Sequence, residues 1–271
     1  MKISGYTCLL FLLCAASCAT PRAYLMSPMD INTNTYHTLP MVGDSQKSAT
    51  YADLAFNTGG SNQHLRDVVL GGRLDFHRAH QFDHFQAYYG GGLSLGNYHV
   101  EDIYHFSNNY YNGMNDTVYH YSASNHFYGV YGLSGGINVV IPFDNGKGEW
   151  RAIGLETSYQ KEFGDFIHYR KGIPDSATDI LATYGQVFAL GGMTEIVGKT
   201  RHGTEFGYKI ALGALIFPNG NYRGDESRNR PFYFYNTLHV TKKKVTGFMQ
   251  VNIGVHAASF QFGVNYNLSK R

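Results

Sequence analysis

The chain has 271 residues, a formal net charge of +2, 15% charged and 15% aromatic residues, 32 glycines and 22 tyrosines. The near-neutral charge argues against a nucleic-acid partner, and the absence of an internal run of about 18 apolar residues excludes a spanning helix. This composition is poor in helix formers and rich in strand and turn residues, so it predicts one large β domain.

Residues 1–17 have the pattern of an export signal, with a basic start and an apolar centre. The sequence AASC at 15–18 resembles a bacterial lipobox, whose cysteine is lipidated and becomes the new N-terminus. An ordinary cleavage site beside an unrelated cysteine is the alternative. All three cysteines lie within the first 18 residues, which excludes disulfide bonds and cysteine-based metal sites in the body. We therefore expect a covalent lipid on Cys18 and no other cofactor.

Residues 18–47 show no periodicity and contain several prolines, so we expect a lipidated, extended tether. The positions that follow the lipobox in a recognisable order are Cys18, Pro21, Tyr24, Ser27, Pro28 and Asn32. This order resembles the start of Bacteroidota outer-membrane β-barrel lipoproteins, although LPMVGD at 39–44 replaces their Pro-Leu-Leu…Lys-Gly-Glu stretch. The resemblance implies a small barrel in the bacterial outer membrane and carries no activity over to particular residues.

The remaining domain, 48–271, divides into ten predicted strands. They are placed near 48–57, 64–79, 84–99, 126–141, 149–161, 182–197, 204–217, 231–241, 245–256 and 259–269. In the last two, apolar residues alternate with amides, hydroxyls and glycines that carry little charge. Such a face is untypical of a water-exposed surface and indicates apolar side chains outward to lipid and small or polar ones inward. A soluble ligand-binding barrel, which would bury its apolar face, is the alternative fold.

The sixth predicted strand does not follow this alternation well. Gln186 shares a face with Phe188 and Leu190. We therefore expect a bulge at Gly191-Gly192 or a different register.

Long predicted connections follow strands three, five and seven, at 100–125, 162–181 and 218–230, so they fall at one end of the barrel. Outer-membrane barrels have this asymmetry, with long loops outside and short turns in the periplasm. The even strand count then predicts both termini in the periplasm, with the lipid of Cys18 in the inner leaflet. The fold class is thus an all-β antiparallel transmembrane barrel of about ten strands.

A barrel of this size is narrow, and its inward side chains largely fill it. The charged residues predicted to form a lumen polar network are Asp67, Arg73, Asp75, Glu156 and Lys209. Glycines in the strands make room for the bulky inward side chains of Tyr88, Tyr128, Tyr233 and Tyr235. A filled lumen is the expectation, and a small selective pore is the alternative.

The long loops are rich in tyrosine and asparagine, which suits a binding surface because these side chains combine contact area with adaptable hydrogen bonds. Candidate binding residues are Tyr104, His105, Tyr110, Tyr111, Tyr119, Tyr121, His168, Tyr169, Tyr222 and Arg223. We expect a non-catalytic role, as a structural or accessory subunit of an envelope complex or as a surface-binding protein. Partners would be outer-membrane lipids, with other envelope proteins or surface glycan as further candidates, and no nucleic acid.

An outer-membrane hydrolase is the remaining alternative. The histidines in or beside the long loops are His105, His120, His126 and His168, with Asp116, Asp165 and Ser122 close in sequence. A catalytic set needs a nucleophile, a base and an orienting group within hydrogen-bond reach, and no recognisable spacing such as G-x-S-x-G occurs. We therefore expect no catalysis and no metal site at these loops, and a solvated turn at the lysines 242–244.

Overall fold

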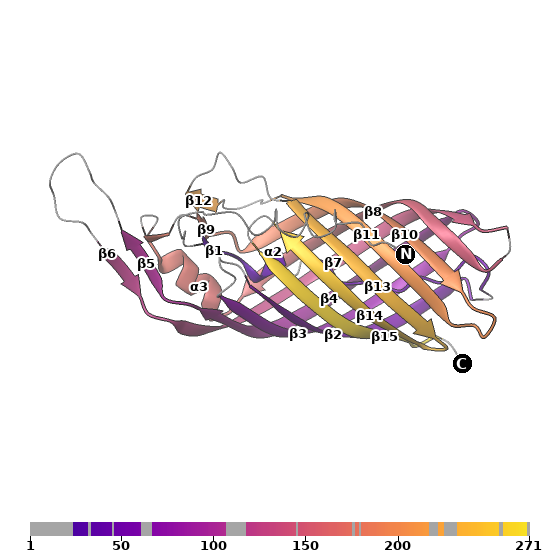
Figure 1. Ribbon diagram of the computed structural model, residues 1–271, viewed down its shortest axis with the longest axis horizontal. Helices are drawn as coiled ribbons and strands as arrows, with labels where there is room; N and C mark the ends of the chain where they lie inside the picture. Colours follow the sequence, from indigo (N-terminus) through magenta and orange to yellow (C-terminus); the bar gives the residue numbers. More distant parts are fainter. Residues whose placement is uncertain are drawn as a thin grey trace, which may run out of the picture.

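The computed structural model describes residues 24–31, 34–44, 46–60, 67–106, 118–144, 146–174, 177–178, 180–216, 222–224, 232–254 and 257–269. Within this part of the chain, ten strands form one closed barrel with antiparallel neighbours throughout (Figure 1). In order around the wall they are β2 (Ser48–Gly60), β3 (Val68–Gln81), β4 (Phe85–Val100), β7 (Ser124–Pro142), β8 (Gly148–Phe163), β10 (Gln186–Lys199), β11 (Glu205–Ile216), β13 (Phe232–Lys242), β14 (Val245–Gly254) and β15 (Ala258–Asn267). The last strand pairs with the first, so the predicted ten-stranded antiparallel barrel is confirmed.

The outer surface of the barrel is an apolar belt. Successive side chains of a strand point to opposite faces, and the outward set is mainly leucine, isoleucine, valine and aromatic residues. Leu133 and Ile153 are 67% and 70% exposed, whereas the inward Asp75 and Glu156 are 1% and 2% exposed. Apolar exposure on this scale around a whole wall is typical of a surface that faces lipid.

One extra residue in β8 changes which side chains face the lumen. Val139 pairs with Ile153 and Val140 with Arg151, so Ala152 has no partner in β7. The β8–β10 ladder shifts at the same level. This bulge lets both Arg151 and Glu156 point inward, although strict alternation places an odd and an even position on opposite faces.

The expected bulge at Gly191-Gly192 is therefore wrong, because the irregularity lies near Ala152 of the neighbouring strand. Gln186 does share the outward face of Phe188, as the pattern indicated. It begins β10 next to the long connection, where the hydroxyl of Tyr159 donates a 2.6 Å hydrogen bond to its side-chain oxygen. The polar residue thus has a partner at the rim of the apolar belt.

The long connections all leave one end of the barrel, here called the long-loop mouth. They carry β5 (Ile103–Phe106), β6 (Val118–Tyr121), α3 (Asp165–Gly172), β9 (Ile180–Ala182) and β12 (Tyr222–Gly224). Figure 1 places these elements together at one end. The other end, the short-turn mouth, has connections of a few residues at 82–84, 143–147, 200–204 and 243–244. No helix within the described ranges is long and apolar enough to cross a membrane.

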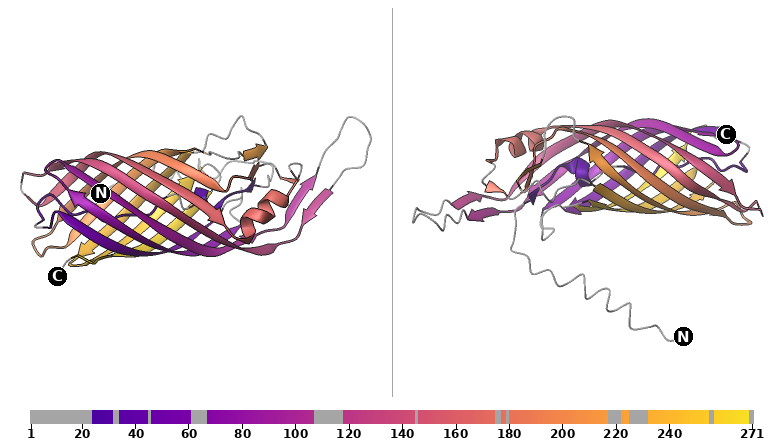
Figure 2. Two further views of the ribbon diagram at one scale, coloured as in Figure 1. Left: turned by 180° about the vertical axis from the view of Figure 1, so that it is seen from behind. Right: turned by 90° about the horizontal axis from the view of Figure 1, so that it is seen from above.

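The described part of the expected tether packs inside the barrel instead. β1 (Tyr24–Leu25) pairs with β9 at the long-loop mouth, and α2 (Pro28–Ile31) contacts β7, β8 and β14 from within. Residues 34–44, here called the plug, then continue to the short-turn mouth, where β2 begins (Figure 2). Residues 24 and 269 therefore lie at opposite mouths.

Candidate functional site

The plug is held by side chains of the wall rather than by a strand ladder. An extended backbone inside a barrel needs partners for its amide and carbonyl groups. Four wall side chains donate hydrogen bonds to plug carbonyl oxygens: Gln250 donates to Asn34 O (2.8 Å), Asn265 to Tyr36 O (3.3 Å), Arg151 to Leu39 O (3.2 Å) and Gln86 to Pro40 O (2.8 Å). The carboxylate of Glu149 accepts a hydrogen bond from Val42 N (2.7 Å). The amide-rich inner face of the last hairpin thus serves the plug backbone.

The first charged cluster of the lumen centres on Glu156. Its carboxylate accepts hydrogen bonds from Lys209 Nζ at 2.5 Å, from the hydroxyl of Tyr88 at 2.9 Å and from the hydroxyl of Tyr235. All four side chains are buried. The structure therefore brings together Glu156 and Lys209, which the sequence placed on the inner face, within a network in which each hydrogen bond to the ionised groups is strengthened.

The second cluster centres on Arg151, one of the largest fully buried side chains. Its guanidinium donates to Glu149 Oε1 at 3.0 Å and to Glu195 Oε2 at 2.6 Å. His239 Nε2 lies 2.8 Å from Glu195 Oε1. The same oxygen accepts a hydrogen bond from the hydroxyl of Tyr36 in the plug at 3.1 Å. This cluster joins the plug to β8 and β10. The sequence argument missed Arg151 because the bulge at Ala152 reverses the alternation.

The other predicted lumen charges lie in two places. Arg73 and Asp75 form a two-pronged ion pair on β3, with N–O distances of 2.6 and 2.9 Å. Asp67 lies just before β3 at the long-loop mouth, where its carboxylate accepts from the hydroxyl of Tyr98 at 3.2 Å and the amide of Glu101 at 3.0 Å.

Glycines make room for the inward tyrosines at close approaches. A Cβ on Gly136 would lie 2.5 Å from the ring of Tyr88, and one on Gly213 would lie 2.5 Å from the ring of Tyr233. Tyr88 and Tyr233 are 5% and 3% exposed. These side chains, with the plug, fill the lumen.

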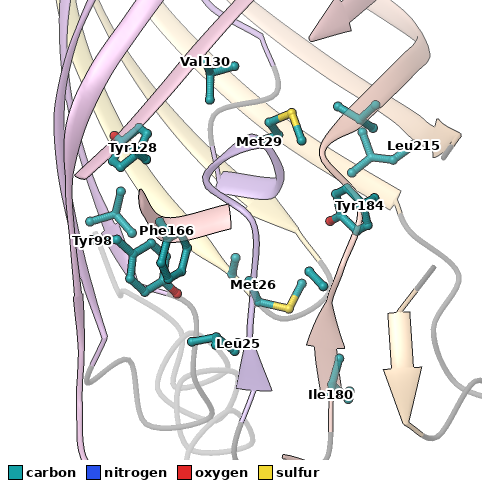
Figure 3. Close-up of a cluster of buried hydrophobic side chains, with 14 of the residues drawn as sticks. Leu25, Met26, Met29, Tyr98, Tyr128, Val130, Phe166, Ile180, Tyr184 and Leu215 are labelled. Carbon is teal, nitrogen blue, oxygen red and sulfur yellow. The ribbon is translucent and has the colours of Figure 1, made fainter. Parts of the chain in front are cut away.

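A mouth cluster of apolar side chains closes the long-loop end (Figure 3). It includes Leu25, Met26, Met29, Tyr98, Phe166 and Tyr184. The rings of Tyr98 and Phe166 stack with centroids 3.9 Å apart. Beside them the buried Glu162 accepts from Ser27 Oγ at 2.8 Å and from the guanidinium of Arg170 in α3. The segment 25–29 is thereby anchored to both the wall and α3.

The predicted loop-binding residues are placed only in part. Tyr110 and Tyr111 lie outside the described residues, as does Cys18, and the backbones of Tyr104, His105, Tyr119, Tyr222 and Arg223 lie in short strands at the long-loop mouth. Tyr121 packs against the mouth cluster, and His168 is exposed on α3. Tyr169 stacks on His126 with centroids 4.0 Å apart, and burial raises the pKa of its hydroxyl. The predicted binding residues that the structure describes are therefore spread over β5, β6, α3 and β12.

Three side chains at this mouth are connected in the serine–histidine–carboxylate order of a catalytic triad. Ser124 Oγ lies 2.8 Å from His126 Nε2, and His126 Nδ1 lies 2.7 Å from Asp165 Oδ2. Ser124 and His126 are two residues apart on β7 and share a face, while Asp165 begins α3. The sequence argument named His126 and Asp165 but paired them with the nearby Ser122. Ser124 was missed because its contact with His126 depends on the strand that begins there.

The short-turn mouth holds a polar cavity of about 130 Å³. Its lining includes Thr38, Tyr51, Glu205, Lys243 and Lys244. The second and third lysines of the 242–244 run thus face this cavity as well as the turn.

No protein-family model matches the chain, and no curated protein sequence is similar to it. Similar solved structures include the KdgM porin in complex with disordered oligogalacturonate, with 12% identity, a TM-score of 0.30, and 80% of this chain and 98% of that chain covered. The β domain of the Bordetella autotransporter BrkA has 10% identity, a TM-score of 0.39, and 82% and 100% coverage. OprG from Pseudomonas aeruginosa has 11% identity, a TM-score of 0.35, and 82% and 97% coverage. The closed strand pairing and the apolar belt show that the chain folds as an antiparallel transmembrane β-barrel.

Proposed function

We propose that this protein is a lipid-anchored outer-membrane barrel that does not conduct and acts as a non-catalytic binding or accessory subunit through its long-loop mouth. The observation that carries this proposal is the plug, which fills the lumen with buried hydrogen-bonded groups. The mouth cluster supports it, because it covers the long-loop end of the same lumen. Binding is assigned to the loops because loops on a rigid scaffold are where recognition residues concentrate.

The position of β1 bears on where the lipid lies. Cys18 precedes Tyr24 by six residues, which reach at most about 20 Å when fully extended. Tyr24 pairs with Ile180 at the long-loop mouth, and the bilayer is about 40 Å thick. With long loops outside, the acylated Cys18 would insert into the outer leaflet rather than the periplasmic leaflet expected from strand parity.

The test of the filled lumen is conductance in planar bilayers. The intact protein is expected to show no channel activity, and a variant with 34–41 replaced by glycine and serine is expected to conduct. Loss of heat-modifiable gel mobility in that variant would show misfolding, so this control is run first. Ion-selective current through the intact protein would refute the non-conducting barrel.

The binding role is tested by co-purification from native membranes. Shortening 104–121 should release an outer partner, whereas replacing the lysines 242–244 at the opposite mouth should leave it bound. The reverse pattern would show that the working surface is periplasmic.

A second candidate function, hydrolysis of an ester at the outer rim, is favoured by the Ser124–His126–Asp165 arrangement. In such a set the histidine takes the serine proton during attack on the substrate carbonyl, and the carboxylate orients the histidine. The test is labelling of the intact protein with a fluorophosphonate. Labelling that is lost in Ser124→Ala and kept in Ser122→Ala would support hydrolysis, and absence of labelling in the wild type would refute it.

A further inference from the structure

A buried cluster of His37, Asp53 and His77 joins the plug to the wall. His37 lies on the plug, Asp53 on β2 and His77 on β3. The three residues are 5%, 2% and 2% exposed, and one ligand atom from each lies within 4.8 Å of the other two. No wall segment alone could form this cluster, since it exists only when the plug is in the lumen.

The hydrogen bonds of His77 show that a cation belongs between its ring and Asp53. His77 Nε2 lies 2.9 Å from the carbonyl oxygen of Thr38, which only accepts hydrogen bonds, so Nε2 carries the proton. His77 Nδ1 lies 2.6 Å from Asp53 Oδ2. An unprotonated Nδ1 would present a lone pair to the carboxylate at this distance. Either a proton, carried by the ring or by the carboxyl group, or a metal ion must therefore lie between the two atoms.

Two further atoms of the cluster have no hydrogen-bond partner, and this distinguishes the two possibilities. Asp53 Oδ1 is buried without a hydrogen bond, and His37 Nδ1 is buried at 3.4 Å from Asp53 Oδ2 without the geometry of a hydrogen bond. A proton on His77 satisfies neither of them, and a buried unsatisfied polar atom costs free energy. A metal ion next to Asp53 would take His37 Nδ1 as a ligand and place a positive charge beside both oxygens of Asp53, so its protein ligands are two imidazole nitrogens and one carboxylate.

The spacing suits a small transition-metal ion after a modest adjustment. Zinc binds imidazole and carboxylate at about 2.0–2.2 Å, so tetrahedral ligand atoms lie about 3.4 Å apart. The distance from His37 Nδ1 to Asp53 Oδ2 is already 3.4 Å. His77 Nδ1 and Asp53 Oδ2 must separate by about 0.8 Å to admit an ion at the same bond lengths.

Oxygen atoms behind the rings hold both histidines with Nδ1 toward Asp53. His77 Nε2 faces Thr38 O, and His37 Nε2 lies 3.0 Å from Ser134 Oγ. Such outer contacts are usual for metal-binding histidines, because they fix the tautomer and the ring orientation. The ring of Tyr51 stacks on His77 with centroids 4.7 Å apart and an angle of 9°.

The local charge also favours a cation. The nearby Asp75 has its own partner in Arg73, whereas Asp53 is in contact with the two histidines. Among the described buried residues, carboxylates outnumber lysine and arginine side chains. The cavity at the short-turn mouth is lined by Thr38 and Tyr51, which both touch His77. It provides a polar approach to the cluster.

We propose that His37, Asp53 and His77 bind one divalent transition-metal ion of the zinc class, which fastens the plug to β2 and β3. Imidazole nitrogens with a carboxylate select this class over magnesium and calcium, which prefer oxygen ligands. The site is independent of the loops and of the triad at the opposite mouth.

The test is titration of the full-length protein, purified in detergent and freed of metal with a chelator, with Co²⁺ and Zn²⁺. One equivalent of Co²⁺ is expected to give visible d–d absorption bands, and Zn²⁺ is expected to displace it. Loss of a ligand should weaken binding more than about tenfold. His37→Ala is the main variant, because it leaves the barrel wall unchanged, and His239→Ala removes another buried lumen histidine as the matched control.

Heat-modifiable gel mobility confirms that each variant is folded before titration. Binding that is weakened in His37→Ala and unchanged in His239→Ala supports the site, as does slower amide exchange of the plug on adding Zn²⁺. Absence of one-equivalent binding in the folded wild type, or equal binding by His37→Ala, overturns the proposal. The contact between His77 and Asp53 would then hold a proton in place of a metal ion.

Discussion

Replacing Arg151 by methionine tests whether the buried charges hold the barrel and the plug together. The change keeps an apolar side chain of similar length but removes hydrogen bonds to Glu149, Glu195 and Leu39 O. Two buried carboxylates then lose their common cation, and Glu195 keeps its 2.8 Å contact with His239 Nε2. Breaking a buried pair from one side costs about 3–5 kcal/mol, so we expect the free energy of unfolding to fall by about this amount.

The measurement is urea unfolding of the refolded protein in lipid vesicles, followed by fluorescence of Trp150, the single tryptophan. Adding Glu149→Gln and Glu195→Gln to the arginine variant should recover much of the loss, because neutral groups are cheaper to bury unpaired than charges. Acidification should narrow the gap between Arg151→Met and the wild type, since protonated carboxylates no longer repel each other. A loss of less than about 1 kcal/mol would refute the reasoning, since that is the range of an exposed ion pair.

Three further outcomes are expected. Leu212→Arg places a charge on the lipid-facing side of β11 and should lower the free energy of unfolding in vesicles by about 2–4 kcal/mol. Gly213→Leu on the inner side should prevent folding, because the new side chain would clash with Tyr233. Equal tolerance of both substitutions would contradict the assigned faces. Cys18→Ala should abolish labelling by a clickable fatty acid, and equal labelling of wild type and variant would exclude that lipidation site. Shortening 104–121 to a glycine-serine turn should leave heat-modifiable mobility unchanged, because loop length contributes little to closure free energy; an unfolded product would show that the loop belongs to the barrel core.

The alternation along the strands was sufficient to predict the barrel, because a strand exposes every second side chain to the same solvent. The pairs Val245–Tyr266 and Ile253–Ala258 lie at the two ends of the last hairpin, whose apolar residues face outward as expected. Connection lengths likewise predicted one mouth with long loops and one with short turns. These features depend on period and length alone, which are local properties of the chain.

The lumen contents required the tertiary structure. Arg151 lies inside because a bulge at Ala152 breaks the period, and no local pattern marks that position. The sequence shows the excess of Gln and Asn on the inner faces. It does not show their structural role, because these amides bind the backbone of a plug that lies far away in the chain.

The amino-acid sequence by itself determined the fold class, the strand number and the faces of most strands, since membrane and lumen impose opposite chemistry on alternate residues. Only the tertiary structure decided that the proline-containing segment before β2 fills the barrel. That segment has no periodicity, and it is held by wall partners such as Gln250, Gln86 and Arg151, which lie far from it in the sequence. The same long-range contacts bring His37 to Asp53 and His77, because a site shared between a plug and a wall exists only once both have folded together.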